Sequence, residues 1–218
     1  MKRKTIFFLL LFLIIPFIGK ADVWSEPAVK QYFSKNRNYK LVIYPAITPE
    51  KYAEWLKYRT IDMRLSQSER RKKERFFSNL TASDTVLVPC TGILYHISGD
   101  DTIKIWERKL LNAVCPVTAN VSDDGSSVVT FNNWYSNGYG VNVMVVYNEK
   151  GDAKRTYKLE EITPYPLNDY FISLSSIWWN AGTRFIDNNR IEISFQNEKH
   201  AIIRRIYNTH QFIFENQP

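Results

Sequence analysis

The stretch of the chain that is richest in ligand-binding side chains runs from Asn132 to Gly140. It reads NNWYSNGYG and combines Trp134, Tyr135 and Tyr139 with three asparagines. Flat aromatic rings stack on sugar rings and peptide side chains, and each asparagine amide offers both donors and acceptors. We therefore predict a surface that binds a glycan or a peptide. Its residues are Asn132, Asn133, Trp134, Tyr135, Tyr139, Trp178 and Trp179.

The alternative for this loop is purely structural. Aromatic residues in loops usually pack, so the segment can also fold back and bury Trp134 as a cap on a sheet.

Catalytic motifs are scarce. The histidines, His96, His200 and His210, lie in no recognisable catalytic setting, and the chain contains no Gly-x-Ser-x-Gly elbow. The neighbouring acids Glu160 and Glu161 are available, but spacing alone assigns no glycoside-hydrolysing pair. We expect a non-catalytic binding or structural module, with a secreted hydrolase that uses a carboxylate site as the alternative.

Metal and cofactor motifs are equally weak. The cysteines form no CxxC pair, and Asp100-Asp101 and Asp123-Asp124 lie beside turn glycines, so turn chemistry explains both acidic pairs. Gly138-Tyr139-Gly140 lacks the third glycine of a dinucleotide loop, and a strand is expected after it. We predict no metal and no cofactor.

The two cysteines of the chain are Cys90 and Cys115. An exported protein meets an oxidising compartment, where an even pair of cysteines favours a disulfide. We predict a Cys90–Cys115 disulfide, which would stabilise the fold by about 3 kcal/mol on the loop-entropy model. Two buried free thiols are the alternative.

The N-terminus has the pattern of a signal peptide over residues 1–21. Lys2-Arg3-Lys4 precedes an apolar run from Ile6 to Ile18, and Gly19-Lys20-Ala21 fits a cleavage site after Ala21. The run is shorter than the roughly 20 residues of a membrane span. We expect export to the periplasm or extracellular space and no transmembrane span after cleavage, with an uncleaved anchor as the alternative.

Loss of this leader also changes the charge. It removes four of the 29 basic residues and no acid, so the formal net charge falls from +7 to +3. Nucleic acid is therefore not expected as a partner.

The aromatic loop lies within a longer stretch of strand patterns, which extends from Val117 to Leu159. Val117, Ala119 and Val121 alternate with polar residues, and a first hairpin turns at Asp124-Gly125. A second hairpin turns at Gly151, and its first strand is apolar on both faces, which is typical of a central strand. Four strands at this spacing predict an antiparallel meander that resembles one blade of a β-propeller.

The rest of the chain also predicts mainly β structure, either propeller-blade-like or two-sheet, in a single domain over residues 22–218. Two short helices are predicted near residues 49–79, opened by Thr48-Pro49-Glu50 and by a capping box at Ser66. The further strands are expected at Tyr39–Tyr44, Thr85–Ile97, Thr102–Leu111, Tyr170–Leu174, Arg190–Phe195, Ala201–Tyr207 and Gln211–Phe214.

The stretch from Trp106 to Asp187 also resembles a group of uncharacterised secreted bacterial proteins. The parts that carry the resemblance are Trp106-Glu107-Arg108, Val121–Gly125, Thr130–Trp134, Gly138-Tyr139-Gly140 and Ser175–Trp179. The resemblance implies export and a β fold, and it implies no activity.

Overall fold

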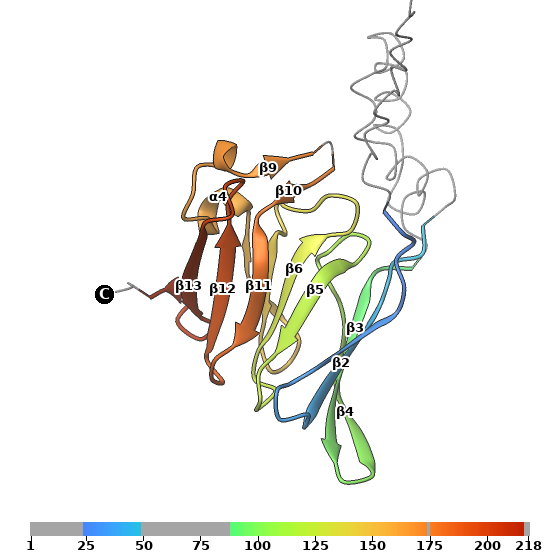
Figure 1. Cartoon of the computed structure of the whole chain (residues 1–218). Coiled ribbons are helices and arrows are strands. Elements are labelled where there is room, and N and C mark those ends of the chain that lie inside the picture. The colour runs from blue at the N-terminus through green and yellow to red at the C-terminus, as the bar shows by residue number, and fades with distance from the viewer. Residues whose placement is uncertain (1–23, 49–87, 174, 216–218) are drawn as a thin grey trace, which may run out of the picture.

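A computed structural model of the chain describes residues 24–48, 88–173 and 175–215. This part of the protein is mainly β and contains three four-stranded antiparallel sheets (Figure 1). The first sheet consists of β1 (Lys30–Phe33), β2 (Tyr39–Tyr44), β3 (Thr91–Ser98) and β4 (Asp101–Lys109). The central sheet consists of β5 (Pro116–Val121), β6 (Val128–Asn133), β7 (Met144–Tyr147) and β8 (Ala153–Tyr157). The third sheet consists of β11 (Asn180–Phe185), β12 (Arg190–Gln196), β13 (Ile202–Asn208) and β14 (Ile213–Phe214).

Each sheet is a meander, because the order of its strands follows the order of the sequence. The first strand of the central sheet, β5, contacts both β1 and β11, which are the first strands of the other two sheets. Successive meanders whose inner strands meet are the arrangement of β-propeller blades. Between the central and third sheets the chain forms a small cap. It contains α4 (Leu159–Ile162), the 3-10 turn η2 (Leu167–Asp169), β9 (Phe171–Ile172) and β10 (Ile177–Trp178).

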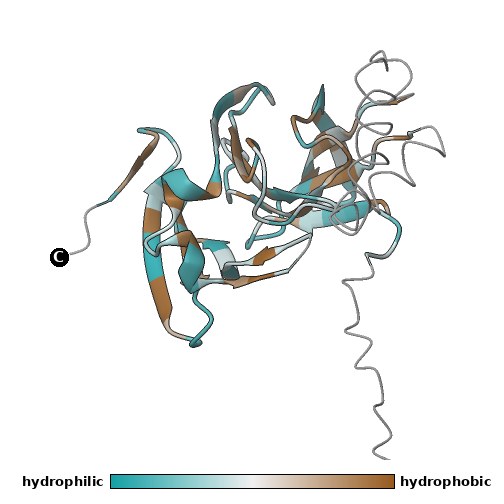
Figure 2. Ribbon diagram, turned by 90° about the horizontal axis from the view of Figure 1, so that it is seen from above, coloured by the Kyte–Doolittle hydropathy of each residue, from teal (hydrophilic) through white to brown (hydrophobic). Residues whose placement is uncertain are grey.

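The two inner strands of the central sheet, β6 and β7, are buried on both faces. Side chains alternate between the faces of a strand, so Val128 and Val145 enter a first core with residues of the first sheet such as Leu94. Their neighbours Val129 and Val146 enter a second core, shared with the third sheet. Figure 2 shows alternating apolar and polar residues along the strands and mostly hydrophilic turns. Two hydrophobic cores therefore share one sheet as their common wall.

Most of the predicted strands are confirmed. The meander predicted over Val117–Leu159 is β5 to β8, and its second hairpin begins with a strand that is covered on both sides. The hairpins β3–β4 and β12–β13 lie where the sequence predicts them. The patterns missed β1 and β11, because β1 has four residues of mixed polarity and β11 contains a glycine and a register shift.

The described residues contain one α-helix, and it is not one of the two predicted helices. The two helices predicted near residues 49–79 lie outside the described residues. The α-helix that the structure does describe, α4, was not predicted. It buries Leu159 and Ile162 against the second core, and the Glu161 carboxylate accepts the backbone N–H of Lys158 at 2.6 Å. Four residues are too few for the repeating apolar pattern that reveals a helix in a sequence.

The predicted disulfide is wrong. Cys90 and Cys115 are both free thiols, and both are buried in the first core. Burial raises the pKa of each thiol to about 12, with a further contribution at Cys90 from the neighbouring Cys115. Each cysteine thus acts as a small apolar side chain in its neutral form.

We predict that neither thiol reacts with iodoacetamide in the native protein at mildly alkaline pH. The thiolate is the reactive form, and burial disfavours it while also blocking access. In concentrated guanidinium chloride without reductant, mass spectrometry should then detect two added carbamidomethyl groups. An unfolded chain that accepts none would instead carry a disulfide.

We also predict that Gly125→Ala destabilises the protein more than Gly99→Ala. Both glycines have positive φ, at 69° and 60°, where a side chain costs about 1 to 2 kcal/mol. A Cβ at Gly99 meets no atom within 4 Å, whereas a Cβ at Gly125 would overlap the ring of Tyr39. That overlap adds about 1 to 3 kcal/mol of overpacking. Equal midpoints for the two variants in urea unfolding would contradict this account of the Gly125 turn.

Candidate functional site

The predicted binding loop connects β6 to β7, and its first residue is an internal hydrogen-bonding centre. Asn132 is 2% exposed and has a positive φ of 61°. Its Oδ1 accepts the indole N–H of the fully buried Trp179 at 2.9 Å and the backbone N–H of Gly138 at 2.9 Å. Its backbone carbonyl accepts a hydrogen bond from the buried Asn112 amide at 2.9 Å. Asn132 and Trp179 thus fix the loop from inside.

The aromatic residues at the start of the loop pack against the first described residues of the chain. Trp134 is half-buried, and its indole N–H donates to the Ser25 carbonyl at 3.0 Å. Tyr135 is 5% exposed and donates to a Glu26 carboxylate oxygen at 3.3 Å. Trp24 lies edge-on to both rings. This packing corresponds to the structural alternative, in which the loop folds back over Trp134.

Of the other predicted residues, Asn133 and Tyr139 form hydrogen bonds within the protein, and Trp178 is exposed to solvent. Asn133 accepts a hydrogen bond from the Asn112 amide, and the hydroxyl of Tyr139 donates to the Ser173 carbonyl. Trp178 is 57% exposed and lies edge-on to Phe171, with ring centroids 5.8 Å apart. The structure therefore brings the two predicted segments together, but Trp178 is the one residue of the seven that is exposed. Ligand binding by this surface stays a prediction.

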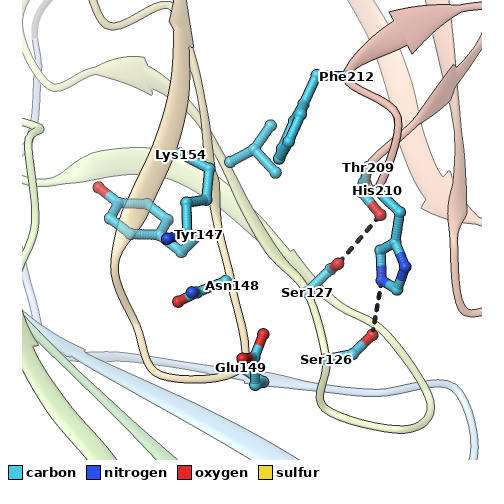
Figure 3. A pocket seen from close by; sticks show the side chains of 10 residues that line it. Ser126, Ser127, Tyr147, Asn148, Glu149, Lys154, Thr209, His210 and Phe212 are labelled. Atoms are coloured by element: carbon cyan, nitrogen blue, oxygen red, sulfur yellow. Dashed lines mark hydrogen bonds between the residues drawn. The ribbon is translucent and has the colours of Figure 1, made fainter.

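A polar cleft lies at the other end of the strands, between the central and third sheets (Figure 3). Its volume is about 390 Å³. The central sheet supplies the end of the turn between β5 and β6, the end of β7, the turn after β7 and Lys154 of β8, while the third sheet supplies the turn between β13 and β14. The lining residues are Ser126, Ser127, Val146, Tyr147, Asn148, Glu149, Lys154, Thr209, His210 and Phe212.

Hydroxyl groups join the two walls of this cleft. The buried Ser127 hydroxyl donates to the Thr209 hydroxyl at 3.0 Å, and Thr209 in turn donates to the Asn189 carbonyl at 3.1 Å. Closer to the opening, Ser126 Oγ lies 3.4 Å from His210 Nε2. The cleft thus combines a fixed base of paired hydroxyls with more exposed polar side chains above it.

The serine–histidine contact does not amount to an acyl-transfer site. Backbone N–H groups that could stabilise an oxyanion are already used, because Ser126 N–H donates to Asp124 and Ser127 N–H donates to the Ser122 hydroxyl. Within the described ranges, no carboxylate forms an ion pair with His210 and so none orients its ring.

Sequence reasoning missed this cleft, because its two walls are far apart in the chain. Ser126 and His210 are separated by 84 positions. Ser126 follows the Asp124-Gly125 turn and His210 follows Thr209 in another turn, and neither segment contains a motif with a known spacing. The turn residues themselves were the available signal, since binding residues often lie on loops held by a rigid scaffold.

A larger groove, of about 880 Å³, lies over the outer face of the first sheet and includes Tyr135 of the predicted loop. Its lining is mostly apolar, and of its two carboxylates Glu107 pairs with Lys104 at 2.9 Å while Glu26 accepts the Tyr135 hydroxyl. It ends at Thr48 and Val88, where the described residues stop, so the polar cleft is the better-defined candidate.

Three further findings bear on function. Across residues 24–48, 88–173 and 175–215, no cluster of three histidine, cysteine or acidic side chains is arranged to hold a metal ion. The helices of the same part of the chain are too short or too polar to cross a membrane. The chain matches no protein-family model and no curated protein sequence.

We predict that Asn132→Ala lowers the free energy of unfolding by about 2 to 6 kcal/mol. The substitution leaves the buried Trp179 indole N–H and the Gly138 N–H without their acceptor, and each unsatisfied group costs about 1 to 3 kcal/mol. Trp178→Ala, which removes an exposed ring, should change the unfolding energy by less than about 1 kcal/mol. Urea denaturation followed by tryptophan fluorescence measures both. A stable Asn132→Ala variant would show that this amide does not hold the loop.

Proposed function

We propose that this protein is an exported, non-catalytic module that binds a glycan in the cleft between its central and third sheets. The observation that carries the proposal is the cleft itself. It is a concave site lined by hydroxyl, amide, imidazole, ammonium and carboxylate groups, with the aromatic ring of Phe212 at one end (Figure 3).

The chemistry of the lining suits a sugar better than an apolar ligand. Asn148, His210 and the serine hydroxyls offer both donors and acceptors, which sugar hydroxyl groups require. Phe212 supplies an apolar ring for the C–H face of a sugar. A volume of about 390 Å³ lies within the usual range of small-molecule sites. A short glycan segment therefore fits the cleft in both size and polarity.

The cleft is also largely pre-formed. The Ser127–Thr209 hydrogen bond joins its walls, and the Asn148 side chain accepts the backbone N–H groups of Lys150 and Asp152, which fixes the turn on one side. A site whose walls are already ordered loses little conformational entropy when a ligand binds. Weak individual hydrogen bonds to a sugar can then add up to measurable affinity.

Export is supported by the N-terminal pattern of Lys2-Arg3-Lys4 followed by an apolar run. The buried free thiols are compatible with this proposal, since shielding protects them from oxidation in an oxidising compartment.

A secreted hydrolase is the second candidate, and the contact between Ser126 Oγ and His210 Nε2 is the observation in its favour. It is weaker than the binding proposal because the neighbouring backbone N–H groups are already bonded. Incubation with a bound oligosaccharide, followed by chromatography of the products, separates the two candidates. Product formation that is lost in His210→Asn would establish the hydrolase.

We predict that a glycan array identifies a bound oligosaccharide and that His210→Asn weakens its binding about tenfold. One lost polar contact of about 1.4 kcal/mol corresponds to that factor. His200→Asn is the matched control, because His200 is another exposed histidine in a turn of the third sheet and does not line the cleft. Isothermal titration calorimetry measures both variants. Equal losses of affinity, or no binding to any glycan, would contradict the proposal.

A further inference from the structure

We infer that the cleft selects an acidic sugar, one that carries a carboxylate or a sulfate group. This inference rests on the proposed glycan-binding function and names the ligand class of the same site. Its basis is that one charged group and one hydrogen-bond donor on the walls of the cleft have no ion-pair or hydrogen-bond partner among the described residues.

Lys154 supplies the positive charge. It is an exposed residue of β8, and its side chain lies along the cleft in Figure 3. Several neighbouring charges are paired, for example Arg108 with Asp152 at 3.9 Å and Arg190 with Asp187 at 2.6 Å. In the described part of the chain Lys154 has no such ion pair. A lysine on the wall of a cleft without an anionic partner is available to a negatively charged ligand.

Uncharged donors lie on the same walls. The Oδ1 atom of Asn148 accepts two backbone N–H groups, which turns its amide nitrogen away from those bonds. Among the described residues this nitrogen donates no hydrogen bond. The Ser126 hydroxyl belongs to the central sheet, like Asn148, and the His210 imidazole lies on the facing wall in Figure 3. An anionic oxygen between the walls would accept hydrogen bonds from groups on both sheets.

The one carboxylate of the cleft, Glu149, does not cancel this preference. It belongs to the turn after β7 and lies at the end of the cleft away from Phe212 in Figure 3. Phe212 lies at the other end of the cleft, and Lys154 lies between the two in Figure 3. The cleft therefore combines one carboxylate at its end with one ammonium group along its wall. An acidic sugar matches this polarity, and a neutral sugar uses only part of it.

The test is an array of matched oligosaccharide pairs that differ only at the acidic group. The probes are uronic-acid oligosaccharides, their neutral counterparts and the same neutral chains carrying sulfate esters. The acidic member of a bound pair should bind about tenfold more tightly than the neutral member. Lys154→Gln should remove most of this difference by weakening the binding of the acidic member. Comparison of the carboxylate and sulfate arms identifies which anion is preferred.

Lys150→Gln is the matched control, because Lys150 is an exposed lysine of the same hairpin that does not line the cleft. It should retain the full preference for the acidic member. Equal binding of acidic and neutral members, or an equal effect of Lys150→Gln and Lys154→Gln, would overturn the acidic-sugar inference and leave glycan binding intact. Absence of binding to every oligosaccharide would overturn the proposed function as well.

Discussion

The fold depends on the burial of one sheet on both faces. The strands β6 and β7 are buried at nearly every position, and their alternating apolar side chains divide between two cores. Val145 packs toward the first sheet and Val146 toward the third, so neither outer sheet has a core without the central one. A shift of one residue in either strand would exchange the two sets of side chains and spoil both cores together. The register of the central sheet therefore fixes the positions of all three sheets.

Burial on both faces also explains why asparagine side chains are buried at the end of the strands where the aromatic loop lies. The loop after β6 must close over two cores, and its backbone turns inward at Asn132 with a positive φ. Buried backbone and indole N–H groups need acceptors, and the Asn132 side-chain oxygen accepts those of Gly138 and Trp179. The buried Asn112 amide in turn donates to the Asn132 carbonyl. Residue types that suit ligand binding are equally suited to this task. An asparagine-rich and aromatic loop is thus consistent with a structural closure as well as with a binding site.

At the opposite end the sheets separate, and their turns meet around the polar cleft. The hydroxyls of Ser127 and Thr209 join the central and third sheets at the base of the cleft, and Ser126 meets His210 closer to its opening. Turn residues need polar side chains for local hydrogen bonds, as Asn148 shows, but their remaining donors point to solvent. We propose a function for this cleft because the sheets hold its turns in place while some hydrogen-bond donors of those turns remain available to a ligand.

The sequence by itself determined the class of the fold and much of its strand order. Alternation and turn glycines predicted the central meander, and apolar residues on both faces of Val141–Tyr147 predicted a buried central strand. Such local patterns record which face of a strand is buried, but they do not identify the partner that buries it. Only the tertiary structure decided that Cys90 and Cys115 are separate buried thiols, that Trp179 faces inward while Trp178 faces solvent, and that Ser126 meets His210. Each of these depends on contacts between residues distant in the chain, for which a single sequence carries no local signal.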